Sequence, residues 1–419
     1  MSHFGVICPP VTGHINPMAA IGRALIRRGH QVTLFHVQDI ESKARSEGMQ
    51  FAALGQRDFP TGKLAQSVLQ LSNLSGKAAL DYSVECACTI SNLILRDGPT
   101  AMGQQKLDAV LVDQNEPAGG SVAEHLRIPF LSVCTSLPLN REPLIPPPFV
   151  GWGFSSSTLA KARNRIGYSI ADRLIAPIQA VLNQYRKGWG LPQVQAPDDT
   201  FSQIASIAQL PREFDFPRDR LSPTFHYLGP WFDDKSSSGV DFPFEKLDGR
   251  PIVYGSLGTL QSRDSGYFRI MAEACAGLDA QLVLSLGHGT GEAALDLPGN
   301  PIVVNYAPQL ELLARAAVTI THAGMNTTQQ SLYFGVPAIA IPLAHDQPAI
   351  AARLSRTGAG IAIPPARLTP SRLRAAVQAL LPESSIFRAR ARALRESIRR
   401  SGGVERAADI AEHLTARHC

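Results

Sequence analysis

Residues 305–347 read NYAPQLELLARAAVTITHAGMNTTQQSLYFGVPAIAIPLAHDQ. Two apolar runs, at 317–320 and 336–342, enclose a polar turn and a segment of helical pattern. Strand, loop, helix and strand in this order form the repeating unit of a parallel α/β sheet. The turn THAGMNTT at 321–328 contains a glycine that lets the backbone approach a ligand, followed by residues that cap helices. It therefore suits a phosphate at a helix start, although a purely structural capped loop has a similar sequence.

Three polar clusters follow one another across this stretch, at 306–309 (YAPQ), 322–327 (HAGMNT) and 346–347 (DQ). In order and spacing they resemble the donor-binding box of family 1 nucleotide-sugar glycosyltransferases, which have the GT-B fold. The resemblance is specific, because three separate clusters recur at the right distances. It implies an α/β protein with two Rossmann-like domains, whose parallel sheets face each other across a cleft.

The resemblance also implies a role for each cluster in binding the donor. Tyr306 would stack on the base, and Gln309 would help to hold it. The second cluster would bind the diphosphate and the third the sugar hydroxyls; these residues are His322, Gly324, Asn326, Thr327, Asp346 and Gln347. One position departs from the family pattern, because Gln330 stands where a carboxylate usually binds the ribose hydroxyls. A neutral amide holds a hydroxyl more weakly than a carboxylate does.

Length and composition limit the kind of protein. A chain of 419 residues suits two domains of about 200 residues each. A hydrophobic content of 44% with 18% charged residues is typical of globular proteins, and a net charge of +5 gives no case for a nucleic-acid partner. The six cysteines show no C-x-x-C pair and no zinc-ligand spacing, which favours free thiols. With no signal-peptide core and no apolar run of membrane-spanning length, we expect a soluble, cytoplasmic protein.

The sequence divides into two α/β halves. The N-terminal, acceptor-binding domain is expected at 1–232, and 233–248 has the composition of a linker. The C-terminal, nucleotide-sugar-binding domain is expected at 249–402. Its glycine-rich turn GSLGT at 255–259 resembles the first turn of this domain in the family, where hydroxyls, here those of Ser256 and Thr259, approach the donor phosphates. Residues 403–419 are expected to form the helix that crosses back to the N-terminal domain.

His14 and Asp113 form a candidate catalytic pair. His14 follows the first apolar strand, at the carboxyl end where open α/β sheets bind ligands. Asp113 ends a strand predicted at 107–112, and the parallel topology brings it beside the loop of His14. A carboxylate on one ring nitrogen would fix the tautomer of the imidazole and stabilise its protonated form. A structural loop histidine and a capping aspartate are the alternatives; the family resemblance favours the pair, with His14 as the base.

An apolar, proline-rich loop at 137–154 is too long for a plain connection. It is either a flap that covers the core or one wall of an acceptor pocket. On the second interpretation, the acceptor-binding residues are Gln114, Phe149 and Trp152. The following segment, 158–187, has a helical pattern, and Pro177 is expected to kink or break that helix.

Over nearly its whole length the chain resembles the bacterial zeaxanthin glucosyltransferases, which glycosylate carotenoid hydroxyls. The resemblance rests on FGVICPPVTGHINP, VDQNEPAGGSVAEHLRIPFLSVCTSLPLNREP, GSLGTLQ, THAGMNTTQQ and IPLAHDQPAIAAR. The apolar loop suits a carotenoid, and it would suit a sterol, a flavonoid or a macrolide as well. Six arginines at 387–400 form either a solvated helix face or a weak contact with an anionic membrane.

Together these expectations describe an inverting transferase that moves glucose from UDP-glucose to a hydroxyl of a lipophilic acceptor such as zeaxanthin. No Asp-x-Asp motif is present, so neither a metal nor another cofactor is expected. Two functions of other classes remain as alternatives. One is a UDP-sugar 2-epimerase, which has the same fold and no acceptor; the other is a non-catalytic lipid- or carotenoid-binding protein.

Overall fold

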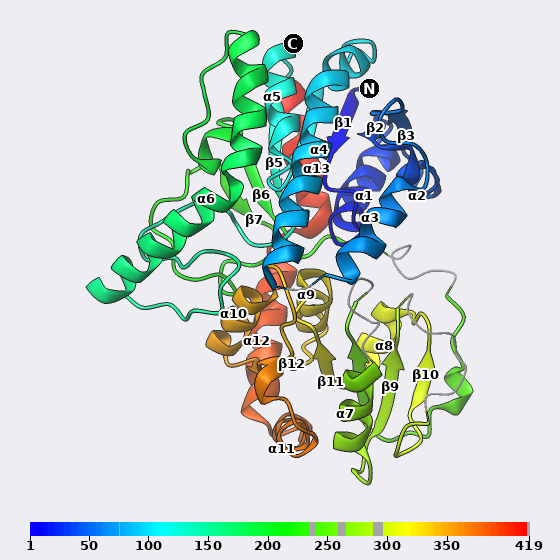
Figure 1. Ribbon diagram of the computed structural model, residues 1–419. Helices are drawn as coiled ribbons and strands as arrows, with labels where there is room; N and C mark the ends of the chain where they lie inside the picture. The colour runs from blue at the N-terminus through cyan, green and yellow to red at the C-terminus, as the bar shows by residue number, and fades with distance from the viewer. Residues whose placement is uncertain (75, 234–239, 259–264, 288–295, 417–419) are drawn as a thin grey trace.

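Two parallel β-sheets organise the chain in a computed structural model, which describes residues 1–74, 76–233, 240–258, 265–287 and 296–416 (Figure 1). The first sheet defines the N-terminal domain and has the order β3 (Gln50–Ala53), β2 (Gln31–His36), β1 (His3–Ile7), β4 (Ala109–Asp113), β5 (Phe130–Cys134), β6 (Ser206–Ala208), β7 (Phe225–Tyr227). The second defines the C-terminal domain and has the order β10 (Ile302–Val304), β9 (Gln281–Ser285), β8 (Ile252–Ser256), β11 (Ala316–Thr321), β12 (Ala338–Ala340), β13 (Gly360–Ala362). The prediction of two Rossmann-like domains with parallel sheets is confirmed.

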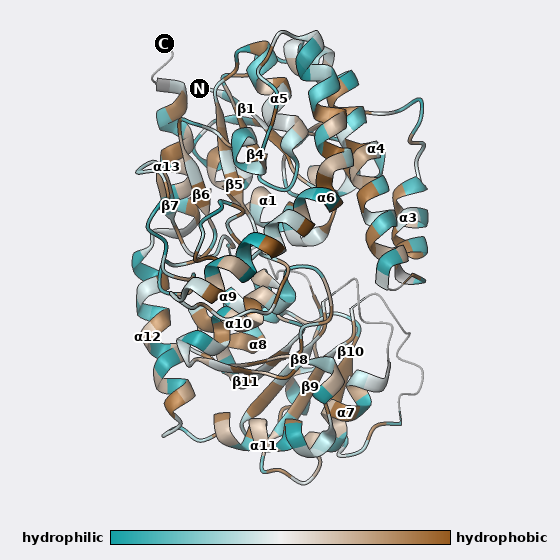
Figure 2. Cartoon of the chain, turned by 60° about the vertical axis from the view of Figure 1, so that its left-hand side comes forward, coloured by the Kyte–Doolittle hydropathy of each residue, from teal (hydrophilic) through white to brown (hydrophobic). Residues whose placement is uncertain are grey.

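Helices cover the sheets because the connections between parallel strands must cross from one end of a sheet to the other. In the N-terminal domain these are α1 (Thr12–Arg27), α2 (Glu41–Ser46), α3 (Lys63–Ser72), α4 (Gly76–Gly103), α5 (Pro117–Leu126) and α6 (Thr158–Gly188). The C-terminal domain carries α7 (Ser265–Cys275), α8 (Gln309–Arg315), α9 (Met325–Tyr333), α10 (Gln347–Thr357) and α11 (Pro370–Leu380). The last helices are α12 (Ile386–Arg400) and α13 (Gly403–Ala416). Figure 2 shows hydrophobic residues running along the strands of the second sheet, as expected for strands covered on both faces.

Strand register brings the predicted catalytic residues to one edge of the first sheet. β1 pairs with β4 so that Ile7 lies beside Val112, and β4 pairs with β5 so that Asp113 lies beside Val133. The carboxyl ends of these strands therefore lie together. Helix α1 begins at Thr12, so His14 lies in the first turn of a helix rather than in the expected loop.

Helix α6 contains Pro177 within a single helical element of 31 residues. Figure 1 shows that this helix changes direction along its length and that its N-terminal part extends away from the body of the molecule. A proline removes one backbone hydrogen bond and crowds the preceding turn, so Pro177 accounts for a bend without ending the helix.

The two domains share buried contacts. One hydrophobic cluster combines Leu210 and Phe214 of the N-terminal domain with Ile350 of α10 and Leu394 of α12. Helix α13 packs against α1 of the N-terminal domain and completes its core with Ala407, Ala408, Ala411 and Leu414. The expected linker falls in part on residues 234–239, which lie outside the described residues. In the part of the chain that the structure describes, no helix is long and apolar enough to cross a bilayer.

Candidate active site

His14 and Asp113 form a direct hydrogen bond where β1 and β4 end. The distance between His14 Nδ1 and Asp113 Oδ2 is 2.8 Å, and the carboxylate is fully buried. About 21% of the His14 side chain remains exposed. Because Asp113 accepts the hydrogen on Nδ1, the unprotonated nitrogen of a neutral imidazole is Nε2. Nε2 is thus available to take a proton from a bound hydroxyl.

Further contacts hold the Asp113 carboxylate in place. Thr135, immediately after β5, donates from Oγ1 to Asp113 Oδ2 over 2.6 Å, and this hydroxyl also lies 2.8 Å from His14 Nδ1. The backbone N–H of Asn115 donates to Asp113 Oδ1 over 2.9 Å. Sequence reasoning missed Thr135, although its place directly after the strand next to β4 could have indicated it.

The charges of the pair shift both pKa values towards the ionised forms. Burial by itself lowers the pKa of His14, but the charge of Asp113 and its hydrogen bond more than offset this, so the pKa of His14 lies above its ordinary value. Burial raises the pKa of Asp113, whereas the charge and hydrogen bond of His14, with help from Thr135, bring that pKa below its ordinary value. The protonated histidine formed during proton transfer is therefore stabilised.

Glu116 is a second buried carboxyl group near the pair. Its Oε1 accepts a hydrogen bond from Ser91 Oγ over 3.1 Å. Burial raises the pKa of Glu116 to about 8, and the charge of Asp113 adds to this effect. At neutral pH the group therefore carries a proton and adds no second negative charge beside Asp113. The sequence placed it in the polar turn after β4 without assigning it a role.

The predicted donor turn reaches the catalytic helix. Asn326, in the first turn of α9, donates from Nδ2 to the backbone oxygen of Gly13 over 3.1 Å. Its Oδ1 accepts from Gln209 Nε2 over 3.0 Å, and Gln209 also donates to the backbone oxygen of Thr135. Asn326 thus joins the predicted diphosphate turn to the first turn of α1 directly and to Thr135, after β5, through Gln209. Gln209, just beyond β6, was not identified from the sequence.

The His322 ring lies against two glycines. A Cβ added at Gly324 would stand 2.5 Å from His322 Nε2, and one at Gly258 would stand 2.7 Å from His322 Cε1. Burial lowers the pKa of His322 to about 4, only partly offset by a hydrogen bond with the Ser256 backbone, so the ring is neutral. Among the described residues, none pairs with its buried Nδ1. The adjacent Ala323 has a left-handed backbone with φ of 66°, a costly conformation that is common at binding sites.

A hydrogen bond between two side-chain amides links Gln309 of the first cluster to Gln330, the position that departs from the family pattern. Gln309 Nε2 donates to Gln330 Oε1 over 2.5 Å, while Gln309 Oε1 accepts from Tyr254 Oη over 3.2 Å and from Thr327 Oγ1 over 3.5 Å. Gln330 is therefore held beside the residue predicted to bind the base. Tyr306, also in the first cluster, keeps 38% of its surface exposed, as a stacking platform requires.

The acid and amide of the third cluster have different environments. Asp346 accepts a hydrogen bond from Ser136 of the N-terminal domain, so this predicted sugar-binding group lies between the domains. The residue before it, His345, has a left-handed φ of 54°. Gln347 is buried, and its Oε1 accepts from the backbone N–H groups of Leu343 and Ala344 over 2.8 and 2.9 Å. Gln347 therefore shapes the loop that presents Asp346.

Other predicted residues are less closely connected to the pair. Ser256 is buried at the end of β8, and Thr259 lies outside the described residues. Gln114 is buried and accepts the backbone N–H of Leu139 over 3.2 Å. Phe149 is exposed, and the Trp152 ring packs against α6 with the Arg163 guanidinium 4.9 Å from its centre. Their role in acceptor binding stays a prediction.

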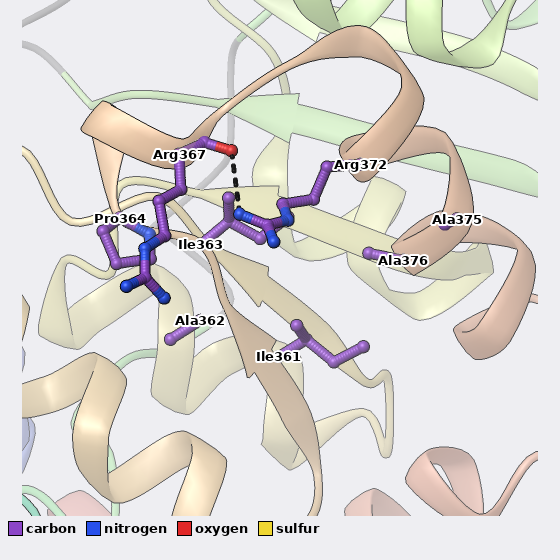
Figure 3. A pocket seen from close by; sticks show the side chains of 8 residues that line it. All are labelled: Ile361, Ala362, Ile363, Pro364, Arg367, Arg372, Ala375 and Ala376. Atoms are coloured by element: carbon purple, nitrogen blue, oxygen red, sulfur yellow. Dashed lines mark hydrogen bonds between the residues drawn. The ribbon is translucent and has the colours of Figure 1, made fainter.

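A hollow with a volume of about 430 Å³ lies at the edge of the C-terminal domain, and Figure 3 shows the side chains that line it. It lies between β13 and α11 and is lined by Ile361, Ala362, Ile363, Pro364, Arg367, Arg372, Ala375 and Ala376. Arg372 donates to the backbone oxygen of Arg367 across it over 3.4 Å. None of the predicted site residues lines this hollow, and it contains no carboxylate or imidazole. Within the described ranges, no three His, Cys, Asp or Glu side chains gather as a metal site would require.

Comparisons with known proteins agree with this two-domain architecture. A family model described as the erythromycin biosynthesis protein CIII-like C-terminal domain matches residues 269–412. The zeaxanthin glucosyltransferase of Pantoea ananas is 34% identical over 417 residues, covering 99% of this chain and 96% of that protein. That of Pseudescherichia vulneris is 30% identical over 419 residues, with coverages of 99% and 98%. The solved glycotransferase of kitacinnamycin superposes with a TM-score of 0.79 at 25% identity, covering 99% of both chains.

Two parallel-sheet domains, with a hydrogen bond between them next to His14, have the architecture of the GT-B glycosyltransferases. The chain belongs to the glycosyltransferase family that includes the zeaxanthin glucosyltransferases. The expectation of a glycosyltransferase is therefore confirmed.

Proposed function

We propose that the chain transfers glucose from UDP-glucose to a hydroxyl group of a lipophilic acceptor, in one inverting step without a metal. His14 Nε2 removes the proton of the acceptor hydroxyl as its oxygen forms a bond to the anomeric carbon. The bond from that carbon to the diphosphate breaks, and UDP leaves with the electron pair. Asp113 stabilises the resulting positive charge on His14.

The observation that carries this proposal is the hydrogen bond from Asn326 to the backbone of Gly13. It brings the start of α9 next to the residue that precedes His14. The unpaired N–H groups at the start of a helix and its positive dipole end suit a diphosphate, and they would offset its charge where a metal otherwise does. A sugar attached to such a diphosphate would extend towards His14 on one side and Asp346 on the other.

The choice of acceptor rests on the relatives and on the apolar loop. Two relatives that align over nearly the whole chain are named zeaxanthin glucosyltransferases. The loop at 137–154 carries the exposed Phe149. It also approaches α10, as shown by Gly151, where an added Cβ would lie 3.4 Å from Pro348. An apolar wall beside the first turn of α10 suits a lipophilic acceptor, and the two relatives point to a carotenoid such as zeaxanthin among such acceptors.

A competition assay tests the proposal. The enzyme is given UDP-glucose together with zeaxanthin in liposomes and a flavonol, and products are identified by mass and by the anomeric configuration of the sugar. We expect β-linked zeaxanthin glucoside, unchanged by EDTA, and a loss of roughly a hundredfold or more in turnover for His14→Ala. Glucosylation of the flavonol alone would overturn the carotenoid assignment. Retained configuration, or near-normal turnover of the variant, would overturn the mechanism.

A further inference from the structure

The N-terminal part of α6 exposes large apolar side chains instead of burying them. Leu159, Ile166 and Ile170 are 81%, 62% and 51% exposed. Their spacing of seven and four residues places them on one stripe of the helix, since seven residues make nearly two full turns. An exposed apolar stripe of this kind marks a contact with a partner or a membrane.

A neighbouring face of the same helix, about 100° round the helix axis from this stripe, contains small residues and holds the helix to the protein. The buried positions are Ala160, Asn164, Gly167 and Ala171. A Cβ at Gly167 would stand 2.9 Å from both Pro147 and the Trp152 ring, and Asn164 donates to the backbone oxygen of Pro143 over 3.1 Å. The helix is therefore seated on the proline-rich loop by its small residues, and its large apolar residues face outwards.

Cations without partners occur on the same part of α6. The side chains of Lys161, Arg165 and Arg173 are exposed, and none forms an ion pair or hydrogen bond within the described residues. The guanidinium of Arg163 lies over the Trp152 ring. The acidic group on this part of the helix, Asp172, is paired with Arg141 over 2.5 Å. At about 100° per residue, Arg163 and Arg173 lie beside the apolar stripe, whereas Arg165 and Lys161 lie roughly 120° and 160° round the helix from it.

We propose that this surface, 158–176 of α6, docks the enzyme onto an anionic lipid bilayer. Leucine and isoleucine side chains enter the boundary between headgroups and acyl chains, Arg173 beside them contacts anionic headgroups, and the charges of Arg165 and Lys161 add to the attraction. A second copy of this chain is a poorer occupant, because a symmetric contact would bring the same unpaired cations together. The basic helix α12, considered from the sequence, is less suited: Arg388 is buried, Arg392 pairs with Glu383, and Arg399 covers Tyr333.

The position of the surface gives it a consequence for the reaction. The loop under this part of α6 continues to Gly151, which contacts Pro348 at the start of α10. In Figure 1 the free end of α6 extends at the level where the two domains meet. An acceptor lying in the bilayer would therefore have a short path to the region of His14 and Asp346. This consequence rests on the proposed function, whereas docking itself does not.

Sedimentation with vesicles tests the docking. The full chain is mixed with sucrose-loaded vesicles of phosphatidylcholine, with and without phosphatidylglycerol, and the bound fraction is measured without substrates. We expect tighter binding to the anionic vesicles. The variant K161Q/R165Q/R173Q should lose this preference, a drop of roughly tenfold to a hundredfold. The variant L159Q/I166Q/I170Q should lose roughly tenfold or more on both kinds of vesicle.

Matched controls separate docking from general effects. The variant K187Q/I386Q removes an exposed lysine from the other end of α6 and an exposed isoleucine from α12, and should bind like the parent protein. All the substituted residues are exposed, so circular dichroism and thermal unfolding should stay unchanged. Equal binding of the parent to neutral and anionic vesicles, or an equal loss in the control, would refute the proposal. So would a dimer in solution that L159Q/I166Q/I170Q converts to a monomer.

Discussion

The His14 side chain takes its tautomer and its basicity from Asp113, so exchanging that carboxylate for an amide changes both. Asp113→Asn should lower kcat/KM roughly a hundredfold or more. The acid limb of the pH–rate profile should move to lower pH, because burial still lowers the pKa of His14 while the charge that raised it is gone. Profiles of kcat/KM against pH for both proteins measure this. Thr135→Ser keeps the hydroxyl that contacts Asp113 and should keep the limb in place; an unmoved limb in Asp113→Asn would contradict the assignment.

Glu116 makes the stability of the fold depend on pH. Its folded-state pKa is raised to about 8, so between its ordinary pKa and about pH 8 the folded chain binds a proton that the unfolded chain has lost. Stability from this group is therefore fully present at low pH and is lost as pH rises through the folded pKa. The glutamine in Glu116→Gln cannot ionise, so at pH 8 this variant should unfold at a higher urea concentration than the parent. The gain in the free energy of unfolding should be about 1.4 kcal/mol for each unit by which folding raises the pKa of Glu116. Near pH 4.5 the two proteins should unfold at the same urea concentration. Parallel unfolding curves at both pH values would contradict a protonated Glu116.

At the scale of single elements, the strand ends were predictable and their cross-domain contacts were not. Apolar runs identified β1, β4 and β11, and the rule that parallel strands present ligands at their carboxyl ends brought His14 and Asp113 together. Thr135 obeys the same rule. The contacts of Ser136 with Asp346 and of Gln209 with Asn326 join residues more than a hundred positions apart across a domain interface. No local pattern encodes such a contact, because it depends on how one folded domain sits on the other.

Helix α6 shows a second limit of sequence reading. Its apolar positions indicate an amphipathic helix, but periodicity cannot tell which side faces the protein. The small residues Ala160, Gly167 and Ala171 fill the narrow space beside the proline-rich loop, so the larger Ile166 and Ile170 face outwards.

The start of α9 offers a test at the scale of a loop and a helix. Gly324→Ala should displace the His322 ring, because the added carbon would lie 2.5 Å from Nε2. We expect weaker binding of UDP, roughly tenfold or more, measured by calorimetry. Gly188→Ala is the matched control, since a Cβ at Gly188 meets nothing within 4 Å. Unchanged UDP affinity in Gly324→Ala would show that the position of this ring does not matter for the donor.

At the scale of the whole molecule, a buried charge cluster joins the domains. Asp215 accepts from Arg353 of α10 over 2.8 Å and from Arg218 over 2.6 Å, and all three side chains are almost fully buried. Burial raises the pKa of Asp215, but the two arginines lower it well below its ordinary value, so the carboxylate stays charged. Asp215→Asn should lower the free energy of unfolding by about 3–5 kcal/mol, because it leaves the buried Arg353 without a counter-charge and Arg218 with only Glu142, 3.9 Å away.

Chemical unfolding followed by tryptophan fluorescence and circular dichroism measures this loss. Because the cluster links the domains, the variant should also unfold in two steps where the parent unfolds in one. Lys77→Gln, which breaks an exposed ion pair with Asp81, serves as the control and should leave the transition in place. A single, unshifted transition in Asp215→Asn would show that the apolar contacts alone hold the domains together.

The packing of α13 on α1 has a consequence for the order of events during synthesis. Residues 403–416 leave the ribosome after the whole of both sheets, yet they belong to the same hydrophobic core as Met18 and Leu25 of α1, and Arg28 binds Glu405 and Asp409. Part of the hydrophobic core of the nascent N-terminal domain therefore stays exposed until the C-terminal domain and α13 have been synthesised. A chain that ends at residue 402 should therefore aggregate in cells. Its soluble fraction should rise when a chaperone or a separate peptide of residues 403–419 is expressed with it, which a split-expression experiment measures.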